Sequence, residues 1–129
     1  MQIDDYFSEI QKIIKSCNAV GTFDVYYDKR GTHEGFIRGE IYLLDGSILH
    51  FREFIDVETL INRLLYVYHY VDSSKKLIFR YDNTGHHKKL NLATFPHHKH
   101  EGSENKIISS TAPTLRGVLN EILTSISIF

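Results

Sequence analysis

The sequence predicts an α+β protein, a single domain over residues 1–129 in which an antiparallel sheet of about five strands is flanked by N-terminal and C-terminal helices. Two observations lead to this fold class. Apolar residues recur at helical spacing at both ends of the chain. Between the ends, short runs rich in β-branched and aromatic residues alternate with turn-forming residues, which is typical of an antiparallel meander.

Each end of the chain carries one apolar stripe, the pattern of a helix that packs on a sheet. We expect one helix over roughly residues 3–16 and another over roughly residues 113–127, with Thr111 and Pro113 as start signals for the second. Because each stripe needs a surface that buries it, both helices should pack on the same sheet. The stripes are Ile3, Tyr6, Phe7, Ile10 and Ile14, and Leu115, Val118, Leu119, Ile122, Leu123 and Ile126.

The segments between the helices are read as strands with tight turns. Asp45-Gly46 between two of them predicts a hairpin, and residues 72–75 predict a second tight turn. Residues 56–64 fit either a short helix or a continued strand. The predicted strands cover residues 20–27, 35–44, 47–55, 65–71 and 77–81.

Several side chains on these strands are expected to be structural. Tyr66, Tyr68 and Tyr70 share one face, which favours aromatic packing over a base-stacking platform. Glu53 and Arg38, possible neighbours in the first hairpin, are expected to form a cross-strand charge pair. His33 and His50 are given no functional role.

Composition excludes several classes of protein. Hydrophobic residues make up 42% and charged residues 24% of the chain, which is typical of a globular protein and not of a disordered one. Cys17 is the only cysteine, so a disulfide framework and a cysteine-based zinc site are excluded and a reducing cytoplasm is the expected setting. The acidic N-terminus does not resemble a signal peptide, and no apolar run approaches the roughly 20 residues of a membrane span.

Charge is distributed unevenly along the chain. The net charge of −1 does not suggest a general nucleic-acid binder. Residues 75–100 nevertheless hold six Lys and Arg residues against one acid, Asp82, together with five of the eight histidines. Such a local basic patch can bind phosphate groups, although a solvated loop with lysines that promote solubility fits the charges as well.

The stretch from Asp82 to Glu101 is where we expect any chemistry to lie. Strand alternation places Arg80 and Asp82 on one face, which His69 shares if the turn before them has an even number of residues. Residues 82–85 have turn chemistry, and residues 86–102 are expected to form a long loop that could include one short strand. Histidines that exchange protons near neutral pH, cations that stabilise phosphate and a carboxylate that orients a ring are what phosphodiester cleavage needs. With a 2′-hydroxyl as nucleophile, RNA would require no cofactor.

A metal site is the competing interpretation of the same histidines. His97, His98 and His100 could bind a metal together with His86 or Asp82. Adjacent residues of an extended chain point to opposite faces, however, so only His98 and His100 would act together, and their spacing matches no standard zinc motif. We therefore expect no metal and no cofactor. Individual rings could also cap turns or pack on aromatic residues.

The ordered set of local patterns resembles the TumE family of prokaryotic toxin–antitoxin proteins over roughly residues 20–125. The resemblance implies a small cytoplasmic toxin that pairs with a helix-turn-helix-type antitoxin. One departure is Gly85, which stands where the family commonly has a proline before the His-His pair. The patterns are Asp45-Gly46-Ser47, a strand with Glu53, Tyr66-Val67-Tyr68-His69-Tyr70, Ile78-Phe79-Arg80-Tyr81-Asp82-Asn83, His86-His87 and Phe95-Pro96-His97-His98-Lys99-His100.

The residues and the resemblance together predict a toxin that cleaves RNA without a metal. In this hypothesis His86 and His98 are the acid–base pair, with His100 in reserve. Arg80 binds the phosphate and Asp82 is the orienting carboxylate. The alternative is a non-catalytic binding module whose histidine-rich loop contacts a partner protein or a metal ion.

Overall fold

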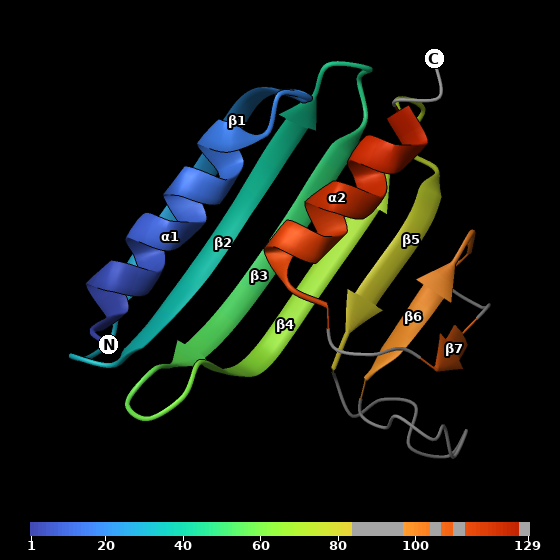
Figure 1. The fold of residues 1–129 in the computed structure, drawn as a ribbon. Helices are drawn as coiled ribbons and strands as arrows, with labels where there is room; N and C mark the ends of the chain where they lie inside the picture. The colour runs from blue at the N-terminus through green and yellow to red at the C-terminus, as the bar shows by residue number, and fades with distance from the viewer. Residues whose placement is uncertain (84–96, 104–106, 110–112, 127–129) are drawn as a thin grey trace.

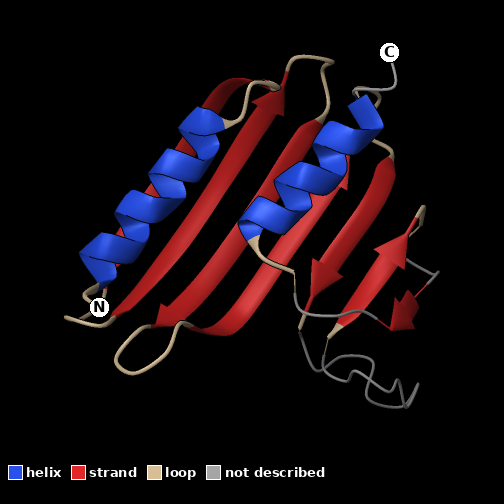
Figure 2. Cartoon of the chain, viewed as in Figure 1, coloured by secondary structure: helices blue, strands red, loops and turns tan. Residues whose placement is uncertain are grey.

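The computed structural model describes residues 1–83, 97–103, 107–109 and 113–126. Its strands form one antiparallel sheet in sequence order, and both helices lie on the same face of it (Figures 1 and 2). The α+β prediction is therefore confirmed. The elements are α1 (Ile3–Ser16), β1 (Val20–Lys29), β2 (Glu34–Leu43), β3 (Ile48–Asp56), β4 (Asn62–Val71), β5 (Leu77–Asp82), β6 (His98–Glu101), β7 (Ile107–Ser109) and α2 (Leu115–Ile126).

Helix α1 follows directly from its apolar spacing. The backbone N–H of Gln2 donates to Asp5 Oδ2 at 3.0 Å, which satisfies a donor before the first turn. The predicted stripe is buried. Gly35 of β2 permits the close approach, because a Cβ there would lie 2.6 Å from the Phe7 ring and 2.7 Å from Ile3.

Helix α2 begins two residues after Pro113. The Thr114 hydroxyl accepts a hydrogen bond from the Gly117 N–H at 3.1 Å, so Thr114 caps the helix. Four residues of the predicted stripe are buried, and Leu123 and Ile126 pack against the core. The prediction that both helices cover one sheet is thus confirmed (Figure 1).

Two tight turns fix the register of the central strands. Gly46 adopts a φ of +87°, and the Gly46 N–H donates to the Leu43 carbonyl at 3.1 Å. In the second turn Asp72 Oδ1 accepts from the N–H groups of Ser74 and Lys76 at 2.8 and 3.0 Å. Both predicted turns are confirmed.

The strand count differs from the expectation of about five. The described residues form seven strands: β6 lies within residues 86–102, where the expected loop allowed one short strand, and β7 lies beyond it, where no element was predicted. The sequence His98–Glu101 lacks the β-branched and aromatic residues that identify strands. It forms a strand because its backbone pairs with the edge of β5. Of the ambiguous segment, residues 62–64 belong to β4 and residues 57–61 have no regular structure.

The sheet has two different faces. The face under the helices holds the core, in which Tyr66, Tyr68 and Tyr70 are buried, so the expectation of aromatic packing is confirmed. Glu53 is also buried there, opposite Ile37, and the expected pair with Arg38 is wrong. Neighbouring residues of a strand point to opposite faces of the sheet, so an error of one residue in register exchanges the faces. Arg38 lies on the face without helices, opposite Arg52.

The helices are short. No helix in the described part of the chain is long and apolar enough to cross a membrane.

Candidate functional site

The face of the sheet without helices carries two rows of aligned side chains, most of them polar. Residues that are Cα partners on neighbouring strands share a face, so a continuous register places their side chains side by side. The first row contains Asp24, Glu40, His50, His69, Arg80 and His100 from β1 to β6. The second contains Tyr26, Arg38, Arg52, Val67 and Asp82 from β1 to β5.

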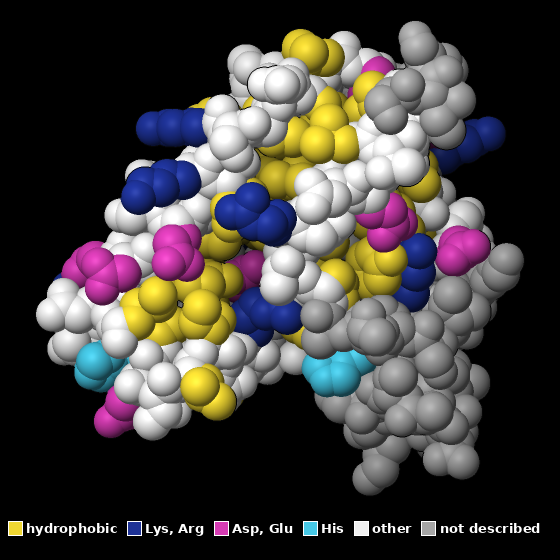
Figure 3. Space-filling view, in the orientation of Figure 1, with side chains coloured by type: hydrophobic (Ala, Val, Ile, Leu, Met, Phe, Trp, Pro, Cys, Tyr) yellow, Lys and Arg dark blue, Asp and Glu magenta, His cyan; other side chains and the backbone are white. Residues whose placement is uncertain are grey.

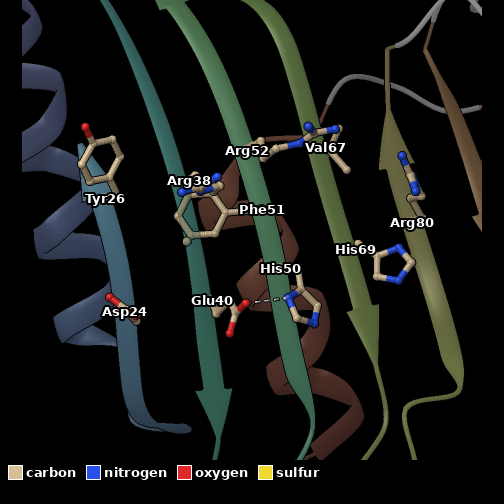
Figure 4. Close-up of a pocket in the computed structure, with 11 residues that line it drawn as sticks. Asp24, Tyr26, Arg38, Glu40, His50, Phe51, Arg52, Val67, His69 and Arg80 are labelled. Atoms are coloured by element: carbon tan, nitrogen blue, oxygen red, sulfur yellow. Dashed lines mark ion pairs between the residues drawn. The ribbon is translucent and has the colours of Figure 1, made fainter. Parts of the chain in front are cut away.

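A groove of about 520 Å³ lies over these rows, here called the open-face groove. Figure 4 shows its side chains on β1 to β5, with His50 and His69 on adjacent strands and Arg80 beyond them. Polar and cationic groups gathered in one concave site make it a candidate for binding an anionic ligand. The groove is lined by Asp24, Tyr26, Arg38, Gly39, Glu40, His50, Phe51, Arg52, Val67, His69 and Arg80.

One end of the open-face groove is organised by a buried carboxylate. The side chain of Asp82 is 1% exposed, and Arg80 Nε donates to its Oδ2 at 3.0 Å. His100 Nε2 lies 3.6 Å from the same oxygen. A buried carboxylate requires such partners, since an isolated buried charge is strongly destabilising. Asp82 therefore holds the Arg80 and His100 side chains in fixed positions.

The exposed fractions of the Arg80 and His100 side chains indicate different roles for these two partners of Asp82. The Arg80 side chain is 27% exposed and lines the groove, so its guanidinium can reach a ligand there. The His100 side chain is only 6% exposed. It is better placed to position Asp82 and Arg80 than to contact a substrate.

Two histidines lie next to this cluster in the first row. His50 and His69 are Cα partners on β3 and β4, and their ring centroids are 6.0 Å apart. Glu40 Oε1 lies 3.6 Å from His50 Nδ1, which is the dashed contact in Figure 4. On the other side His69 is the Cα partner of Arg80. The row thus holds a carboxylate, two imidazoles and a guanidinium in sequence.

Two arginines face each other in the second row. Arg38 and Arg52 are Cα partners and both are exposed. Neither forms an ion pair with another residue in the parts of the chain that the structure describes. Like charges directly opposite each other on neighbouring strands repel, and a bound anion would relieve that repulsion.

The structure brings together three of the residues that the sequence predicted for the site: Arg80, Asp82 and His100. The backbone of His98 pairs with Asp82 across β5 and β6. The side chain of His98 and the whole of His86 lie outside the described residues, so this acid–base pair stays a prediction.

Sequence reasoning missed His50 and the pair of arginines. Alternation along β3 was the available signal, because Leu49, Phe51 and Ile55 take the apolar face and leave His50 and Arg52 on the other. The register between β3 and β4, which residues 57–61 connect, then places His50 beside His69.

Two other roles were considered for the histidine stretch: packing on aromatic residues and binding a metal. The His97 ring stacks on Tyr66 with centroids 5.8 Å apart, and the Tyr66 hydroxyl lies 2.7 Å from His97 Nδ1, so this ring packs on an aromatic residue as one alternative proposed. No group of three or more His, Cys, Asp or Glu residues within the described ranges could hold a metal ion. The metal alternative involves His86 and the His98 side chain, which lie outside those ranges.

The helix-covered face has a second polar cluster. The hydroxyls of Tyr6 and Tyr68 both donate to the Glu53 carboxylate, and Arg63 Nη1 donates to the Tyr68 hydroxyl at 3.0 Å. Burial raises the pKa of Glu53, against the opposing effect of the two tyrosine hydrogen bonds and Arg63. In the view of Figure 3, apolar side chains are visible between the two helices, with Lys, Arg and acidic side chains beside them.

Comparison with known proteins gives one result that covers nearly the whole chain. The family model described as toxin TumE matches residues 10–128. No curated protein and no solved structure matches the chain at a significant level. The family match covers the second half of α1, every strand and α2, and the chain belongs to the TumE toxin family.

Proposed function

We propose that this toxin stops growth by cleaving RNA without a metal, at the open-face groove. The observation that carries the proposal is the Asp82 cluster, in which a buried carboxylate fixes Arg80 at the edge of a groove that also contains histidines and two further arginines. The cations suit a polyanionic substrate, and the imidazoles suit proton transfer near neutral pH.

The proposed reaction uses the 2′-hydroxyl of RNA as its nucleophile. Arg80 binds the phosphate and stabilises the charge that develops on its oxygens. A base takes the 2′ proton and an acid protonates the departing 5′ oxygen; the sequence predicts His86 and His98 for these two roles, and neither side chain lies within the described residues. Asp82 orients Arg80, and His100 supports Asp82 or replaces a member of the pair.

The partner follows from membership of a toxin family, which implies an antitoxin. We propose that this antitoxin is of the helix-turn-helix type and that RNA is the substrate. Repulsion between Arg38 and Arg52, which an anion would relieve, supports a phosphate-containing ligand.

Expression of the toxin with and without its antitoxin tests the proposal, with growth and the integrity of total RNA measured together. We expect the toxin alone to stop growth and fragment RNA. Arg80→Ala should reduce cleavage by roughly 10²–10³-fold, the effect of losing a group that stabilises transition-state charge. Arg30→Ala is the matched control, because Arg30 is exposed and pairs with Asp28 away from the groove.

Growth arrest with intact RNA would contradict the ribonuclease proposal and favour a binding module. Since Arg80→Ala also deprives Asp82 of a partner, thermal melting of each variant must accompany the assay. Arg80→Lys retains the charge but not the planar donor geometry, and it should keep stability better than activity.

A further inference from the structure

We propose that His50 and His69, in place of His86 and His98, are the proton-transfer pair of the open-face groove; this inference rests on the ribonuclease function proposed above. The two rings lie on adjacent strands as direct Cα partners, and both line the groove. Their positions are set by β3 and β4 in the centre of the sheet. Rigid strands place catalytic groups more reproducibly than loops do.

Each ring has one nitrogen directed away from a substrate. His50 Nδ1 faces Glu40 at 3.6 Å, and His69 Nδ1 is buried. Proton exchange with a substrate in the groove would therefore use Nε2 of each ring. A carboxylate next to the far nitrogen of a catalytic histidine fixes the orientation of the ring, which is the role that Glu40 has toward His50.

The spacing of the pair suits one phosphodiester. Ring centroids 6.0 Å apart allow a phosphate over the pair to place its attacking and leaving oxygens within hydrogen-bond reach, roughly 3 Å, of different rings. Arg80, the Cα partner of His69, stands at the end of the same row and can hold the non-bridging oxygens. His100 is less suited to proton transfer than His50, whose side chain is 42% exposed.

The step that the pair would catalyse is a transesterification. One imidazole takes the proton of the 2′-hydroxyl while the 2′ oxygen forms a bond to phosphorus. The bond between phosphorus and the 5′ oxygen breaks, and the second imidazole, in its protonated form, gives its proton to that oxygen. The products are a 2′,3′-cyclic phosphate and a 5′-hydroxyl end. One imidazole has gained a proton and the other has lost one, so the pair as a whole holds the same number of protons as before.

The test compares three single variants of the full-length toxin: His50→Gln, His69→Gln and the matched control His33→Gln. His33 is suited to this purpose because its ring lies outside the groove, with Nδ1 2.9 Å from the Met1 carbonyl oxygen. Initial rates of cleavage of total bacterial RNA are measured, and the ends of the fragments are identified by mass spectrometry. Binding of a short 2′-O-methyl RNA, which lacks the nucleophile, reports whether each variant keeps its fold and its groove.

We expect His50→Gln and His69→Gln each to lose roughly 10²–10⁴-fold in rate, the usual effect of removing a general acid or base. Their affinity for the 2′-O-methyl RNA should stay near that of the wild type, and the double variant should be little slower than the single ones. His33→Gln should behave as wild type.

Three results would overturn the inference, and they differ in what they say about the proposed function. If both variants cleave RNA as fast as His33→Gln while His86→Ala and His98→Ala do not, the pair is wrong and the ribonuclease proposal stands. If the wild-type toxin leaves RNA uncleaved, both are wrong. Loss of rate together with an equal loss of affinity for the 2′-O-methyl RNA would also count against the pair, because it would indicate damage to the groove.

Discussion

Two carboxylates are buried in this sheet, one on each face, and their surroundings differ in kind. Glu53, under the helices, accepts hydrogen bonds from the hydroxyls of Tyr6 and Tyr68. Asp82, on the other face, interacts with Arg80 and His100. Each is 1% exposed or less.

The difference indicates which face does chemistry. Neutral hydroxyls satisfy Glu53 and connect α1 to β4, so the cluster serves the packing of the helix-covered face. Asp82 instead fixes a cation that borders the open-face groove. A buried ion pair contributes little net stability, so its retention beside a groove of histidines and arginines favours a functional role.

The largest expected effect is on stability and lies on the helix-covered face. Leu119 of α2 is 2% exposed, and Leu119→Ala should lower the free energy of unfolding by roughly 2–5 kcal/mol, because it leaves a cavity under the helix. RNA cleavage per folded molecule should not change. Urea denaturation and initial rates measure the two quantities, and an unchanged midpoint would mean that α2 does not pack as described.

Replacing each buried carboxylate by the amide of the same size compares the roles of Asp82 and Glu53 directly. Asp82→Asn should reduce cleavage by roughly 10–100-fold, in the range seen when a residue that orients a functional group is lost. Glu53→Gln keeps the size of the side chain and should leave cleavage unchanged. The same initial-rate assay serves both variants, and equal losses of rate would remove the distinction between the faces.

The pH dependence of stability sharpens the comparison at Glu53. Because burial raises the pKa of Glu53, the folded state binds a proton that the unfolded state has released at the same pH. The free energy of unfolding of the wild type, relative to Glu53→Gln, should therefore fall as pH rises from the ordinary Glu value of about 4.3 through the raised value. Below the ordinary value the difference should be constant.

Urea denaturation of both proteins at a series of pH values across this window gives the difference directly. A difference that grows in favour of the wild type with rising pH would mean that the folded state holds Glu53 as a stabilised anion.

The smallest expected effect concerns one arginine of the open face. Arg52→Ala removes an exposed cation from the groove, so it should weaken binding of 2′-O-methyl RNA and reduce the slope of log affinity against log salt by about 0.7. Arg116→Ala, on α2, is the matched control and should leave the slope unchanged. Fluorescence anisotropy at several salt concentrations measures both, and equal slopes for wild type and Arg52→Ala would exclude a phosphate contact at Arg52.

Much of the fold was predictable from local patterns. Apolar spacing predicted α1 with the bounds that the structure has, and Asp45-Gly46 and Asp72 identified the turns. Strand β6 was not predictable in this way, because His98–Glu101 forms a strand through its pairing with β5 and not through its own composition. Strand β7 has three residues, which is too short to show an alternating pattern.

The candidate site was predictable only in part. Alternation in β5 placed Arg80 and Asp82 on one face from sequence alone. His50 was missed because its place in the row depends on the register of β2, β3 and β4 together, and each hairpin contributes to it. The same dependence made the expected pair of Glu53 with Arg38 wrong by one residue.

Mapping the contact surface of a non-cleavable RNA by NMR is the most direct test of the claim that the open face is the functional one. The toxin, labelled with ¹⁵N, is titrated with a short 2′-O-methyl RNA, and chemical-shift changes are followed for backbone amides and histidine rings. We predict the largest changes at Arg38, His50, Arg52, His69 and Arg80, with little change along α1 and α2. Changes concentrated on the two helices, with the open-face residues unmoved, would contradict the account.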